Sequence, residues 1–430
     1  HPWWRVEAQG VAVPVQAAAV LRGAPAGLAR LLADAPLRLH VAAGLAIDPV
    51  VLPRRPGAVA QVAGDGLELD LPGPGVWTVA LRDRPECALH IAIERPMRGA
   101  GSRLELTFGP GVHEVDRIDL RDGDTLWIDA RAVLRPRPPR ADESPIQIRD
   151  WAGLPVWRPF ILAAGARRIA IRGGGVIDMS ALPWHARTAI CFWRCREVTV
   201  DGVTILDAPA WGVMLHRVET AMVRDVRNIS PRENSDGIDL CNARNVLVEG
   251  CFLRTNDDGV CVKTLDAAPA PPSADITVRR ATVWNERARA LGITSETRQD
   301  IHRVRFEDCD IIRDYSAGGE CAALAVLAAA RGAMRDIAFR RIRVEHGLHT
   351  LALLRVAEDV WGHDAQRGSI AGVRLERIAL GDGVPALLRL DGHDPGHRID
   401  DVAVSGMTRA GAAITPTVEA NAYAAWGSEP

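Results

Sequence analysis

The chain has 430 residues and a formal net charge of −2, from 52 basic and 54 acidic side chains. This balance lacks the basic excess that attracts polyanions, so we expect no nucleic-acid partner. The longest apolar stretch, 322–330, is far shorter than the roughly 20 residues of a membrane-spanning helix, so we expect no membrane partner. Thirty-nine glycines and 28 prolines favour an all-β chain with many turns.

Residues 1–96 contain short alternating runs separated by Gly and Pro, namely Val11–Val15, Leu67–Leu71 and Trp77–Leu81. A period of two residues is typical of strands with one buried face. We therefore predict a small N-terminal β-sandwich at residues 1–96. Residues 94–97 then lead into a second domain, at residues 97–430.

The first residue bears on the location of the protein, and the cysteines bear on metal binding. The chain begins at His1 instead of Met, which is compatible with removal of an export signal and equally with another cut of the chain; on the first alternative we expect a secreted or periplasmic location. The eight cysteines form no zinc-type double Cys-x-x-Cys pattern, so we expect no metal site and no cofactor.

From residue 198 a six-residue unit recurs in which the first, third and sixth positions are apolar. The copies are Val198–Val203, Ala221–Val226, Val246–Cys251, Ile276–Ala281, Val304–Cys309, Ile337–Ile342, Val373–Ile378 and Val402–Met407. Short strands repeating every 20 to 40 residues, without a leucine-rich framework, predict a parallel β-helix. Weaker copies, such as Thr125–Ile128 and Ile169–Asp178, place its start near residue 100. Cys251 and Cys309 share the sixth position two repeats apart, so we expect buried thiols too distant for a disulfide.

Two acidic motifs lie about one repeat apart, Asn234-Ser-Asp236-Gly and Asn256-Asp-Asp258-Gly. Residues one period apart stack in a solenoid, so we expect Asp236 beside the Asp257–Asp258 pair. Each motif alone is also a common turn sequence, because Asn, Asp and Gly are the usual turn formers. Three nearby carboxylates repel one another and raise at least one pKa, as a general acid requires.

Clustered carboxylates of this kind suit inverting hydrolysis of a glycosidic bond. One acid protonates the leaving oxygen, and a carboxylate about 6.5–9.5 Å away activates water.

These motifs resemble those of the polygalacturonase-like glycoside hydrolases, families 28 and 49, over about residues 100–410. The matching segments are Phe108–His113, Gly173–Asp178, Pro209–His216, Asn234–Asp239 and Asn256–Lys263. The resemblance implies a right-handed parallel β-helix that works by inversion without a cofactor. It implies Asp257 as the general acid and Asp236 with Asp258 as the holders of the attacking water. Supporting or substrate-contacting roles fall to Asn234, Asp239 and Lys263.

Two family features are missing. The chain has neither the Gly-His-Gly segment after the paired aspartates nor the later Arg-x-Lys that binds galacturonate, and Ala290–Thr297 stands in the matching repeat. The predicted N-terminal sandwich and the three aspartates move the resemblance toward the dextranase and isopullulanase group. We therefore expect a neutral α-linked poly- or oligosaccharide substrate, with galacturonan or pectin as the alternative.

Further candidates for sugar contacts each have a structural alternative. Glu296 and Arg298 lie on the repeat after the paired aspartates, where a solvated ion pair is equally compatible. Trp284 and Trp211 suit sugar stacking or simple packing. His216 suits a position behind an aspartate, and a purely structural histidine fits better.

Two rival functions share the predicted fold. A calcium-dependent polysaccharide lyase would use clustered acids to hold the metal and Lys263 or Arg254 as the base. A non-catalytic glycan-binding β-helix would present a long surface and leave the acidic motifs unexplained. Inverting glycoside hydrolysis explains both motifs and is the function that we predict.

Overall fold

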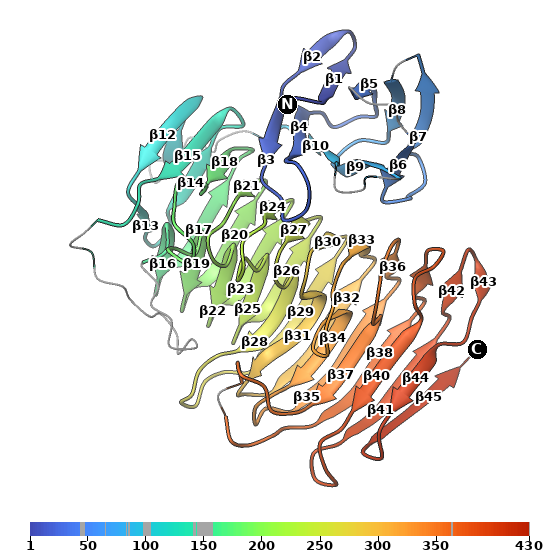
Figure 1. The fold of residues 1–430 in the computed structure, drawn as a ribbon. Helices are drawn as coiled ribbons and strands as arrows, with labels where there is room; N and C mark the ends of the chain where they lie inside the picture. Colours follow the sequence, from blue (N-terminus) through green and yellow to red (C-terminus); the bar gives the residue numbers. More distant parts are fainter. Residues whose placement is uncertain are drawn as a thin grey trace. The chain divides into compact units, whose positions relative to one another are not determined.

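The computed structural model describes the chain except for residues 44–47, 65, 83, 85–86, 98–104, 141–142, 144–157, 363 and 430. All regular elements of the described residues are β-strands, and these residues form no helix that could cross a membrane. The chain divides into two compact units, His1–Ala100 and Gly101–Pro430 (Figure 1).

The first unit contains two five-stranded sheets that share an apolar core. One sheet has the order β2 (Val11–Val13), β1 (Trp4–Ala8), β5 (Leu37–Ala43), β8 (Gly66–Leu71) and β7 (Val59–Ala63). The other has the order β3 (Val15–Ala18), β4 (Ala26–Leu32), β10 (Leu89–Glu94), β9 (Gly75–Leu81) and β6 (Pro49–Leu52). Leu39 and Leu69 of one sheet and Ile91 of the other are fully buried in one cluster. This is the packing of a β-sandwich.

The second unit is a stack of rungs whose strands form three long sheets (Figure 1). Sheet 1 contains β11 (Glu105–Phe108), β14 (Thr125–Ile128), β17 (Arg167–Arg172), β20 (Arg196–Asp201), β23 (Glu219–Arg224), β26 (Arg244–Glu249), β29 (Ser273–Arg279), β32 (Ile301–Glu307), β35 (Met334–Arg340), β38 (Ile370–Glu376), β41 (Ile399–Ser405) and β45 (Ala424–Glu429).

Sheet 2 contains β12 (Gly111–Val115), β15 (Ala132–Pro136), β18 (Val176–Asp178), β21 (Thr204–Leu206), β24 (Arg227–Ser230), β27 (Phe252–Thr255), β30 (Thr282–Asn285), β33 (Asp310–Asp314), β36 (Arg343–Val344), β39 (Ala379–Leu380), β42 (Thr408–Arg409) and β43 (Ala412–Ala413). Sheet 3 contains β13 (Ile118–Leu120), β16 (Ile161–Ala164), β19 (Ile190–Trp193), β22 (Val213–His216), β25 (Ile238–Cys241), β28 (Val260–Thr264), β31 (Arg289–Thr297), β34 (Ala322–Ala328), β37 (Ala352–Val356), β40 (Leu387–Asp391) and β44 (Thr417–Ala420).

The predicted six-residue ladder sets the register of sheet 1. The first positions of successive copies are direct partners, with Val198 opposite Ala221, Ala221 opposite Val246, and Val246 opposite Ile276. Their side chains share one buried core with the sixth-position residues, Cys251 and Cys309 among them. Both cysteines are free, as predicted. The prediction of an all-β parallel β-helix is confirmed.

Each acidic motif requires its glycine for a steric reason at the corner between sheets 2 and 3. A Cβ atom on Gly237 would lie 2.4 Å from the carbonyl oxygen of Gly259. A Cβ atom on Gly259 would lie 2.4 Å from the carbonyl oxygen of Ala290. Consecutive rungs therefore approach at this corner more closely than any side chain allows, and the residues just before these glycines are drawn together.

Candidate active site

The two acidic motifs occupy the same corner on consecutive rungs. Asp236 precedes β25, Asp258 precedes β28, and Ile238 of β25 pairs directly with Val260 of β28. Carboxylate oxygens of Asp236 and Asp258 consequently lie within 4.8 Å of each other. The same two motifs therefore form the turns and bring the carboxylates together.

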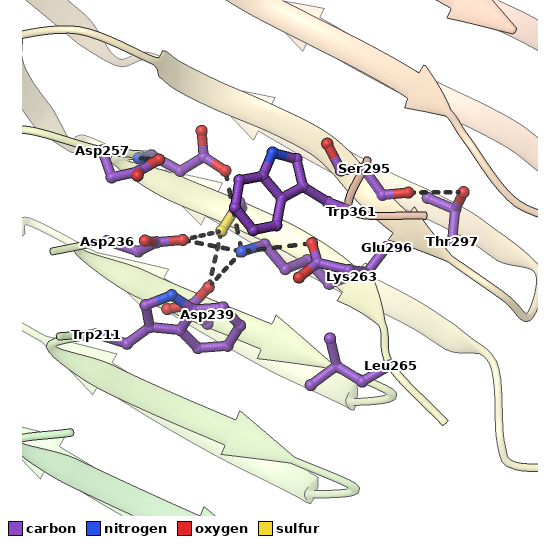
Figure 2. Close-up of polar contacts among 12 residues, drawn as sticks. Trp211, Asp236, Asp239, Asp257, Lys263, Leu265, Ser295, Glu296, Thr297 and Trp361 are labelled. Atoms are coloured by element: carbon purple, nitrogen blue, oxygen red, sulfur yellow. Dashed lines mark hydrogen bonds and ion pairs between the residues drawn. The ribbon is translucent and has the colours of Figure 1, made fainter. Parts of the chain in front are cut away.

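A single ammonium group lies among these carboxylates. Lys263 Nζ is 2.8 Å from Asp236 Oδ2 and 3.0 Å from Asp239 Oδ1. It is also 4.0 Å from Asp258 Oδ2 and 3.7 Å from Glu296 Oε2 (Figure 2). Burial by itself would lower the pKa of Lys263, but the carboxylates of Asp236 and Asp239 outweigh it and hold this pKa well above its usual value. Lys263 is therefore a charged centre of the cluster.

The indole ring of Trp211 packs against this ammonium group. Lys263 Nζ lies 3.9 Å from the centroid of the Trp211 ring, a cation–π contact. The indole Nε1 of Trp211 donates a hydrogen bond of 2.9 Å to Asn234 Oδ1. Asn234 Nδ2 lies 2.7 Å from His185 Nε2. Asn234 thus orients the Trp211 ring, which contacts the Lys263 ammonium.

Arg289 holds the second buried carboxylate. Its Nε lies 2.8 Å from Asp258 Oδ1, and its Nη2 donates to Asp258 Oδ2 at 3.0 Å. A two-point ion pair of this kind fixes both the charge and the orientation of the carboxylate. Asp258 is only 1% exposed, so the ion pair with Arg289 offsets the cost of burying its carboxylate.

Asp257 differs from its two neighbours. It is partly exposed, whereas Asp236 and Asp258 are buried. Burial of its carboxyl group, together with the charges of Asp236 and Asp258, raises the pKa of Asp257 to about 8. The cluster therefore contains one surface-facing carboxylic acid that is protonated at neutral pH.

The floor of the cluster contains two further buried acids with raised pKa values. Burial raises the pKa of Asp236, with the Lys263 ammonium opposing the rise. Burial also raises the pKa of Asp239 well above its usual value, and Cys261 Sγ donates to Asp239 Oδ1 at 3.1 Å. Asp236 Oδ1 and Asp239 Oδ2 have no hydrogen-bond partner among the described residues.

The predicted site residues fall into two groups. Figure 2 shows Asp236, Asp239, Asp257, Lys263 and Glu296 in one cluster. Asn234 and Asp258 also contact this cluster, whereas three predicted contacts, Trp284, His216 and Arg298, are directed elsewhere.

Trp284 is fully buried, with the Arg254 guanidinium 4.0 Å from its ring centroid. His216 Nε2 lies 3.0 Å from Asp266, an aspartate outside the motifs. Arg298 is buried, and its Nη1 donates to the carbonyl oxygen of Leu265. These positions favour packing and structural roles.

Sequence reasoning missed Arg289, and it gave Lys263 only a supporting role. The sequence contains one signal for each of these residues. Lys263 is the only lysine among the 52 basic residues of the chain. Arg289 begins β31, so it occupies the same corner as Asp236 and Asp258 one rung further on.

The segment that carries both acidic motifs is similar to known proteins. A model of glycosyl hydrolases family 28 matches residues 167–340, which include both acidic motifs. A probable polygalacturonase from Vitis vinifera is 25% identical over 126 residues, covering 28% of this chain and 26% of that protein. The matched segments span about a quarter of the length of the first two curated relatives.

Two solved structures share the fold. An exopolygalacturonase from Thermotoga maritima is 19% identical, with a TM-score of 0.58 over 76% of this chain and 83% of that one. Dex49A from Penicillium minioluteum is 11% identical, with a TM-score of 0.64 over 96% of this chain and 89% of that one. The comparisons confirm the predicted resemblance to this group of glycoside hydrolases for the segment that carries the motifs, and the solved structures share its fold.

Proposed function

We propose that this protein is an inverting glycoside hydrolase acting on α-linked poly- or oligosaccharides. Asp257 is the general acid, and Asp236 with Asp258 activates the attacking water. The observation that carries the proposal is the division of the carboxylates. One surface-facing acid has a pKa of about 8, and two buried carboxylates are paired with Lys263 and Arg289. A donor and an acceptor of protons at the same pH are what inversion needs.

The spacing of the two buried carboxylates supports a shared water. One oxygen of each lies within 4.8 Å of the other, close to the roughly 4.5 Å between two acceptors of a bent water at about 2.8 Å per hydrogen bond. Asp236 Oδ1, which has no partner in the described part of the chain, supplies an acceptor for that water. Asn234, Asp239 and Lys263 then hold Asp236 in place.

The charges around the cluster support a neutral substrate. Lys263 is enclosed by carboxylates, Arg289 is bound to Asp258, and Arg287 pairs with Glu233 at 2.7 Å. A uronate carboxylate entering here would meet several anions beside cations that already have partners. Galacturonan is the second candidate substrate, because the curated relatives bear polygalacturonase names.

Lys263 also weighs against the lyase alternative. Its ammonium lies at the centre of the carboxylates that a calcium ion would need, and its raised pKa makes it a poor base at neutral pH. The proposal places all of the chemistry in the second unit of the chain.

Product analysis tests this function. The protein is incubated with dextran, pullulan and polygalacturonate, and proton NMR follows the anomer that forms first. We expect release of β-anomers from a neutral α-glucan and little release from polygalacturonate. Release of α-anomers would overturn the roles given to Asp236 and Asp258. An unsaturated product absorbing in the ultraviolet would establish the lyase instead.

The pKa of Asp257 predicts the alkaline limit of activity. A general acid works only in its protonated form, so kcat/KM is expected to be maintained up to about pH 8 and to fall about tenfold per unit above it. The raised pKa of Asp236 predicts that the acidic limb lies above the usual range of aspartate. A pH–rate profile on the best glycan measures both limbs. An alkaline limb near pH 5 would exclude Asp257 as the acid.

A further inference from the structure

The outer face of sheet 3 continues beyond Lys263 toward the C-terminus. Val262 pairs with Ile293, and Ile293 pairs with Val326, so Leu327 lies two rungs beyond Lys263, across the register shift between Val262 and Thr264, and belongs to an outward-facing row of sheet 3. At about 4.8 Å per rung, this places Leu327 about 10 Å from Lys263 along the stack. The next member of the row is Arg355, the direct partner of Leu327.

A shallow, half-open hollow lies at this point of the face. Leu327 and Ala329 form an apolar part of its lining, and Glu320, Arg355 and Asp359 contribute polar groups. Glu320 and Arg355 are paired at 3.5 Å. An apolar surface bordered by a few hydrogen-bonding groups is the usual composition of a small-ligand site.

The loop after β37 presents an exposed tryptophan, Trp361, next to this hollow. Asp359 Oδ1 accepts hydrogen bonds from the backbone N–H groups of Trp361 and Gly362. Gly362 packs so closely on Ala329 that a Cβ atom would lie 2.5 Å from its carbonyl oxygen. The backbone N–H of Ala329 in turn donates to Thr297, the neighbour of Glu296.

These contacts tie the loop to the rungs beside the carboxylates. Figure 2 shows the Trp361 indole directed toward the cluster that contains Lys263 and Glu296, and Trp361 is 44% exposed.

We infer that Trp361 and the adjoining hollow together form a subsite for an uncharged pyranose ring of the substrate. The inference rests on the proposed glycoside hydrolase function and names a sugar-binding position for the same substrate. An indole face suits the apolar C–H face of a sugar, and the acidic lining accepts its hydroxyl groups. Glu320, Glu358 and Asp359 outnumber Arg355, so the lining repels a uronate.

Chain-length dependence tests the subsite. Isomalto-oligosaccharides of two to six units are compared on the wild type, Trp361→Ala and Trp361→Phe. Trp361→Ala is expected to lower kcat/KM at least tenfold on the hexasaccharide and less than threefold on the disaccharide, with Phe restoring most of the loss. Trp426→Ala is the matched control, since Trp426 is 40% exposed on β45. An equal loss on both lengths, or none, would refute the subsite.

A binding measurement separates this inference from the proposed function. Calorimetry with isomaltohexaose and hexagalacturonate uses Asp257→Asn, with and without Trp361→Ala. At least tenfold weaker binding of isomaltohexaose upon loss of Trp361 supports the subsite even if the wild type hydrolyses no glycan, in which case only the proposed function fails. Unchanged binding, no binding, or a preference for hexagalacturonate overturns the subsite even if hydrolysis is observed.

Discussion

Asp257→Asn is expected to lower kcat by about 10²–10⁴-fold on a natural glycan, which is the usual contribution of a general acid. The amide has the shape of the protonated acid but donates no proton to the leaving oxygen. Asp257 is the only partly exposed residue of the three aspartates, so the change leaves the rung stack intact. The circular dichroism spectrum and the melting temperature should match the wild type within about 2 °C, which corresponds to a surface-like substitution.

A second substrate separates acid catalysis from a general loss of function. A dinitrophenyl glycoside leaves without protonation, so Asp257→Asn should be far less damaging on it than on the glycan. Loss of activity to the same degree on both substrates would contradict the acid role. Retention of most activity on the glycan would remove Asp257 from the mechanism.

Lys263→Met is expected to lower the free energy of unfolding by about 3–5 kcal/mol, the usual effect of removing one partner from a buried ion pair. Met retains much of the apolar stem that packs on Trp211, so the loss reports the charge. Activity should also fall, because Asp236 loses its cation and becomes protonated. Urea unfolding monitored by circular dichroism measures the change, with Arg335→Met as an exposed control of a surface ion pair.

The sign of the pH dependence identifies the cause. Without the ammonium, the folded-state pKa values of Asp236 and Asp239 rise further above their unfolded values. A carboxyl group with a raised folded pKa is destabilising as the pH rises through that pKa, so the deficit of Lys263→Met should grow from pH 5 to pH 8. Adding Asp239→Asn removes one buried charge and should recover part of the stability. A pH-independent deficit, or no recovery, would contradict this account of the cluster.

Local patterns in the chain were sufficient to predict the rungs. The six-residue ladder places Val198, Ala221 and Val246 as direct partners because its apolar positions have only one core to enter. The Asp-Gly pairs also predicted the corner where both motifs lie, since only glycine permits the close rung contact at Gly237 and Gly259. Such features can be predicted from the sequence because each depends on neighbouring residues at a fixed period.

Side-chain direction was less predictable. Trp284 and His216 lie on rungs near the motifs, yet Trp284 packs beneath Arg254 and His216 binds Asp266. Sequence patterns did not predict Arg289, because its role depends on the turn that begins β31 and not on a motif of its own. Whether a side chain faces the surface or the interior is set by the local bend of each turn, which sequence patterns do not specify.

The sequence by itself determined the stack of rungs, the pairing of the two acidic motifs and the class of chemistry they suit. Only the tertiary structure decided how charge is divided among the carboxylates. Lys263 pairs with Asp236 and Asp239, Arg289 pairs with Asp258, and Asp257 is left with a pKa of about 8. The physical reason is that burial and distance set pKa values, and both arise only when rungs far apart in the sequence come together.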